Sequence, residues 1–195
     1  MASLVPPPRS SSESEGWARW YAQELGWATT GTSPLRLLTG LHFDVLELPA
    51  AAGHAALSRV GRTGPVALAG QRMLLLVAAG GADELPGLLD WLEWGGIALD
   101  LTAVGPGGHM IAPAPPGVAS AGSPGAAVWL RPPGSGQGAE ASLPALGGFG
   151  SRGGDAPDLV RLVDAAATEC HRARLTHART NLRAHRPTGQ PLAFS

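Results

Sequence analysis

Residues 96–116 constrain the fold more than any other stretch, because they alternate short apolar runs with turn-forming residues. Residues 97–103 form an apolar, strand-like run that carries one carboxylate, Asp100. A Gly-Pro-Gly-Gly cluster follows at 105–108, and glycine together with proline favours a tight turn. Residues 109–112 then have the character of a second short strand, which three prolines within 113–116 bring to an end. The spacing predicts a β-hairpin whose first strand bears an acid.

The same alternation continues through the chain and indicates its fold class. The 195 residues include 28 Gly and 18 Pro, so many turns are expected, and 44% hydrophobic with 15% charged residues is typical of a globular protein with one core. Helical apolar spacing predicts helices over 15–25, 50–60 and 83–94, and a final helix over 157–186. Strand-like runs occupy 41–48, 65–69, 73–78, 97–103, 109–112 and 126–131. This order predicts an α+β domain with a mixed β-sheet flanked by helices, plus a C-terminal helix.

Composition shifts divide the chain into five parts. Residues 1–15 are rich in Pro, Ser and Glu and are expected to form a disordered lead-in, and residues 16–133 form the domain. Residues 134–156 have the Gly/Ser/Ala composition of a linker. A basic helix over 157–186 and a tail over 187–195 complete the chain.

Several classes of protein are excluded by what the sequence lacks. The single cysteine, Cys170, excludes an internal disulfide and a zinc site built from several cysteines. No apolar run approaches the roughly 18–20 residues that span a membrane. The first residues have neither a basic segment nor an apolar one, so they do not match a secretory signal. We therefore expect a cytoplasmic protein with no membrane partner.

The charges are distributed unevenly along the chain. All 14 basic residues are Arg, which indicates a coding bias, and no acid follows Glu169. The first 170 residues carry a formal charge of −6 and the remainder carries +5. One interpretation is that Arg172, Arg179 and Arg183 bind nucleic acid or an acidic partner. The other is a solvated helix face whose cations complement the helix dipole.

The run 41–48 carries two acids, Asp44 and Glu47. Strict alternation along a strand places these two side chains on opposite faces. A bulge after Asp44 would bring both to the same side. The two arrangements have different consequences, because only the second pairs the carboxylates.

Three local signatures resemble a known family. Residues 20–28 (WYAQELGWA) follow the first predicted helix, residues 46–49 (LELP) precede Gly53 and a helix, and residues 70–74 (GQRML) lead from a turn into a strand. The third signature combines residues 99–102 (LDLT), 107–113 (GGHMIAP) and the Val128-Trp129 strand end. Over about residues 16–133 the chain resembles the bifunctional DNA primase/polymerase N-terminal domain, the Prim-Pol branch of the archaeo-eukaryotic primases.

The resemblance implies roles for particular residues. Glu47 matches the first acid and Asp100 the last acid of a site that holds two divalent metals, Mg²⁺ or Mn²⁺, for nucleotidyl transfer; Asp44 is an alternative member. Clustered carboxylates suit such ions, which lie roughly 4 Å apart. The second acid falls on Pro49, which has no ligand atom. The family's histidine falls on Arg72, which can hold phosphate.

Three functions follow as hypotheses. The first is a primase/polymerase-like domain that has lost catalysis and is retained for nucleotide or nucleic-acid binding in DNA replication or repair. The second is an active metal-dependent nucleotidyltransferase that synthesises or extends primers. The third is a non-enzymatic module that uses the fold to bind another protein.

Overall fold

The structure is a computed structural model that describes residues 9–61, 63–118, 126–134, 138–147 and 158–184. Its helices are α1 (Arg9–Trp20), the π-helical turn η1 (Tyr21–Leu25), α2 (Ala50–Val60), α3 (Gly81–Trp91), α4 (Gly138–Ala141) and α5 (Leu159–Ala184). Its strands are β1 (Thr29–Thr30), β2 (Arg36–Leu38), β3 (Phe43–Pro49), β4 (Val66–Ala69), β5 (Arg72–Ala78), β6 (Thr102–Val104), β7 (His109–Ile111) and β8 (Ala127–Arg131).

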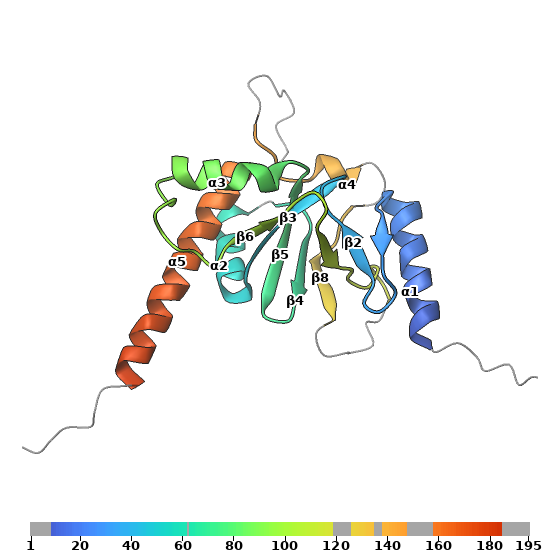
Figure 1. The fold of residues 1–195 in the computed structure, drawn as a ribbon, viewed down its shortest axis with the longest axis horizontal. Helices are drawn as coiled ribbons and strands as arrows, with labels where there is room; N and C mark the ends of the chain where they lie inside the picture. Colours follow the sequence, from blue (N-terminus) through green and yellow to red (C-terminus); the bar gives the residue numbers. More distant parts are fainter. Residues whose placement is uncertain (1–8, 62, 119–125, 135–137, 148–157, 185–195) are drawn as a thin grey trace, which may run out of the picture.

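The strands form two sheets (Figure 1). Five strands pair in the order β6-β3-β5-β4-β8, and three pair in the order β1-β2-β7. The α+β class is confirmed. The expected mixed sheet is not found, because every pairing between these named strands is antiparallel.

The larger sheet is buried on both faces, which explains the continuous apolar run of β5 at its centre. One face packs against α2, α3 and α5, and its side chains include Leu46 and Leu48 of β3. The opposite face packs against η1, β2, β7 and α4, and it receives Phe43 and Val45. Successive β3 residues thus enter two different cores, as the period of a strand requires.

The predicted hairpin over residues 97–112 is wrong. β6 pairs with β3 in the larger sheet, whereas β7 pairs with β2 in the smaller one. The connection between them is held by Thr39, whose backbone N–H donates to the Gly108 carbonyl and whose hydroxyl donates to the Gly105 carbonyl. These bonds hold the 105–108 loop in place where the chain crosses from the larger sheet to the smaller one, so β6 and β7 do not pair with each other.

Two predicted segment boundaries also differ from the structure. Helix α1 begins at Arg9, so residues 9–15 are helical rather than part of a disordered lead-in. The expected linker contains α4, and Ala139 and Leu143 lie buried in the core beneath the larger sheet. Residues 1–8 of the lead-in, residues 135–137 and 148–156 of the linker, and the 187–195 tail lie outside the described residues. Within the described ranges, no helix combines the length and apolar character that a membrane span needs.

Candidate functional site

Glu47 and Arg72 lie side by side at one end of the larger sheet. In the β3–β5 register Glu47 is opposite Leu74 and Pro49 is opposite Arg72, so both charged side chains are on the same face. Arg72 Nε donates to Glu47 Oε1 at 2.8 Å, and both side chains are about one-third exposed. The ion pair is therefore partly buried on this face of the sheet.

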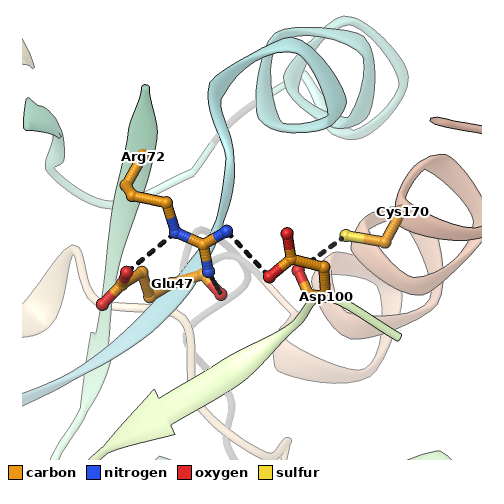
Figure 2. Close-up of polar contacts among 4 residues, drawn as sticks. All are labelled: Glu47, Arg72, Asp100 and Cys170. Atoms are coloured by element: carbon orange, nitrogen blue, oxygen red, sulfur yellow. Dashed lines mark hydrogen bonds and ion pairs between the residues drawn. The ribbon is translucent and has the colours of Figure 1, made fainter. Parts of the chain in front are cut away.

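Asp100 completes a bridge through the same guanidinium (Figure 2). Arg72 Nη1 donates to Asp100 Oδ1 at 2.7 Å, from the edge opposite Glu47. Burial alone would lower the pKa of Arg72, but its hydrogen bonds and charge interactions with Asp100 and Glu47 raise it above its ordinary value. The arginine is therefore a permanent cation between two carboxylates.

Cys170 connects this bridge to α5. Its Sγ donates to the backbone carbonyl of Asp100 at 3.4 Å. Burial, followed by the negative charge of Asp100, raises the pKa of the Cys170 thiol to about 11. The thiol is therefore neutral at physiological pH and acts as a weak donor in this position.

Asp44 does not join these groups. The β3–β5 register runs without a bulge from Phe43 to Pro49, so Asp44 and Glu47 face opposite sides of the sheet. Asp44 is fully buried, and its Oδ2 accepts from the backbone N–H groups of Gly80 and Ala82 at 2.8 and 3.0 Å. Its carboxylate caps the start of α3, where the helix dipole favours a negative charge.

This donor set does not fit a divalent metal. Glu47 and Asp100 are each bound to Arg72, which already supplies the positive charge between them. The position after Glu47 that the resemblance assigns to a second acid is Pro49. In the described part of the chain, no three His, Cys, Asp or Glu side chains cluster as metal ligands.

A cavity of about 270 Å³ opens beside Glu47 and Arg72, between the larger sheet and the β2–β7 pair. Arg36 and His109 line it from the smaller sheet, while Val45 and Leu74 supply apolar wall. Sequence reasoning missed Arg36 and His109. Arg36 is the only charged residue of the apolar stretch 35–38, but nothing in that stretch shows that β2 and β7 pair over the larger sheet.

The three arginines expected to bind nucleic acid lie elsewhere, on α5. At 100° per residue, positions 172, 179 and 183 share one face of the helix, opposite the face of Cys170 and Arg174. Arg172 Nη1 donates to Glu169 Oε1 at 2.9 Å, and Glu169 also pairs with Arg59. Arg179 is exposed, and the side chain of Arg183 lies outside the described structure. This face is separate from the inter-sheet cavity.

Comparisons with protein-family models, with curated proteins and with solved structures give no match for this chain. The resemblance to the primase/polymerase domain therefore rests on the motifs quoted above.

Proposed function

We propose that this chain is a primase/polymerase-like domain without nucleotidyl-transfer activity, and that it binds the phosphates of a nucleotide in the inter-sheet cavity without a metal. The observation that carries the proposal is the set of cations around this cavity. Arg36 and Arg72 line it with a single carboxylate, Glu47, and His109 adds a further hydrogen-bonding group. Arginine binds phosphate through paired donors.

The remaining lining suits the rest of a nucleotide. Val45, Leu74, Val104 and Ile111 give the cavity an apolar wall against which a sugar or base can pack. Its volume of about 270 Å³ lies just below the usual range of about 300–1,000 Å³ for small-molecule sites, so part of the ligand would extend into solvent. Arg72 lies between Glu47 and Asp100 and offsets part of their negative charge, so Arg36 is the main cation that an approaching phosphate would meet.

Calorimetric titration with ATP tests the proposal directly. We expect binding to persist in excess EDTA and to weaken at least about tenfold in Arg36→Ala, since a charge-assisted phosphate contact is lost. Arg161→Ala is the matched control, because Arg161 is an exposed arginine on α5. A strict requirement for Mg²⁺, or unchanged affinity in Arg36→Ala, would reject the proposal.

Primer extension separates this proposal from an active enzyme. The chain is incubated with primer–template, labelled nucleotides and Mn²⁺, and we expect no incorporation. Incorporation that disappears in Asp100→Ala would show that a metal-dependent site forms despite Arg72, and would favour the nucleotidyltransferase instead.

A further inference from the structure

The outward face of α3 carries an exposed tryptophan among acids. Trp91 is 71% exposed. At 100° per residue it shares its side of the helix with Asp83, Glu84 and Asp90, which are also exposed. Gly87 lies in the middle of this face, and nothing lies within 4 Å of the place where its Cβ would be. The face thus combines a large apolar group, negative charge and room for close approach by another helix.

The C-terminal part of α5 has the opposite character. Residues 174–180 are all exposed, Leu175 is 45% exposed, and no acid follows Glu169. Figure 1 shows this end of the helix extending away from the two sheets. By helical position, Leu175 shares a face with Arg172 and Arg179. This end therefore offers an apolar side chain flanked by cations.

The two surfaces are complementary, but α5 cannot bring them together within one chain. Trp94, just after α3, donates from Nε1 to Asp164 in the first half of α5 at 3.4 Å. From Asp164 to Arg179 a straight helix rises about 22 Å. The basic end of α5 therefore lies well beyond its own α3.

We propose that a second copy of this chain supplies the missing partner, with the basic end of α5 of each protomer packed along the acidic face of α3 of the other. A two-fold arrangement makes both contacts at once, because each protomer carries one copy of each surface. The partner's Trp91 packs against Leu175, and Arg179 lies near its ring and the acids beside it. The inference is independent of the nucleotide site.

Nucleic acid is a poorer occupant of these surfaces. The acids of α3 repel phosphate, and a solvated polyanion leaves Leu175 and Trp91 uncovered. A second copy covers both apolar groups and pairs both charged faces. This assigns to Arg172 and Arg179 a protein partner in place of the nucleic acid that the charge distribution alone had suggested.

Light scattering coupled to gel filtration tests the dimer. We expect a dimer at about 0.1 M salt that weakens at about 1 M, where the screening length falls from about 10 to about 3 Å. Trp91→Ala and the charge reversal Arg179→Glu/Arg183→Glu should each raise the dissociation constant at least about tenfold. Arg161→Glu, near the start of the same helix, should leave the dissociation constant unchanged.

A charge exchange makes the test specific to these two faces. Combining Arg179→Glu/Arg183→Glu with Asp83→Arg/Asp90→Arg should restore the dimer, since the attraction is re-formed with its signs exchanged. A monomeric wild type, a dimer insensitive to Trp91→Ala and to the reversal, or failure of the exchange to restore association would each overturn the proposal. Nucleic-acid binding by a monomeric chain that is lost in the reversal would also overturn it.

Discussion

Arg72 and Asp100 are joined by a 2.7 Å hydrogen bond that ties the first residue of β5 to the segment before β6. The guanidinium reaches Asp100 from one edge while its other edge holds Glu47. Two carboxylates that the resemblance assigns to metal ligation are thus linked by a fixed cation. This relationship is the reason that we propose binding without a metal. It also makes Arg72 a link between β5, β3 and the segment before β6.

Removing Arg72 should destabilise the fold. Arg72→Ala loses both ion pairs and leaves the negative charges of Glu47 and Asp100 without their cation, at a cost of about 1–2 kcal/mol in the free energy of unfolding. Glu47→Ala should cost more than Asp100→Ala, because the Asp100 side chain is 62% exposed and that of Glu47 is 32% exposed. Urea unfolding of the three variants measures the order. Equal costs for Glu47→Ala and Asp100→Ala would show that burial does not set the strength of these pairs.

Asp44 should matter for stability and not for ligand binding. Asp44→Ala leaves the N–H groups of Gly80 and Ala82 without their acceptor, which should cost about 1–3 kcal/mol. Asp44→Asn retains an acceptor oxygen and should cost less. Thermal unfolding measures both, and titration with ATP serves as the control. Loss of ATP affinity in a folded Asp44→Asn variant would place Asp44 in the binding site, contrary to its burial on the opposite face.

Strands and helices could be predicted wherever the apolar residues of a segment follow one clear pattern. The apolar run of β5, the helix following Pro49 and the leucine stripe of α3 each have one clear local signal, and each element is found within a few residues of its expected place. The pairing partners of β6 and β7 could not be predicted, because a Gly-Pro-Gly-Gly turn is compatible with both a hairpin and a crossing between sheets. In the structure this turn is bonded to Thr39, 66 residues before Gly105, and its two flanking strands pair with β3 and β2.

The candidate site, too, could be predicted only where a local pattern determines it. Alternation along β3 separates Asp44 from Glu47, and the structure confirms that separation. The ion pairs of Arg72 could not be predicted, because they depend on the register between β3 and β5 and on where the segment that carries Asp100 lies. A local sequence pattern determines neither. Arg36 and His109 come together with Glu47 only because the smaller sheet packs over the larger one.

Cys170 should react slowly with alkylating agents in the folded chain. With its pKa raised from 9.0 to about 11, the thiolate fraction at pH 8 is about a hundredfold lower than for an ordinary thiol. Iodoacetamide labelling followed by mass spectrometry should give a correspondingly slow rate that becomes normal in urea. A rate in native conditions equal to that of the unfolded chain would show that the thiol is not buried against Asp100.

The same shift predicts how stability depends on pH. The folded-state pKa is raised, so the stabilising contribution of the protonated thiol is complete below about pH 9 and is lost as the pH rises through about 11. Urea midpoints of the wild type should therefore fall more steeply between pH 9 and 11 than those of Cys170→Ala. If the urea midpoints of the two proteins fell equally with pH, the raised pKa of Cys170 would be contradicted.

Gly53 and Gly16 make a matched pair of helical glycines with opposite expected responses. In α2, a Cβ on Gly53 would lie 2.2 Å from Met73 Sδ and 2.9 Å from Met73 Cβ, so Gly53→Ala forces α2 away from β5. Overpacking of this kind costs about 1–3 kcal/mol, which exceeds the gain of about 1 kcal/mol in helix propensity. In α1, nothing lies within 4 Å of a Cβ on Gly16, so Gly16→Ala should stabilise. Urea unfolding measures both, and a stabilising Gly53→Ala would mean that Met73 yields without displacing the helix.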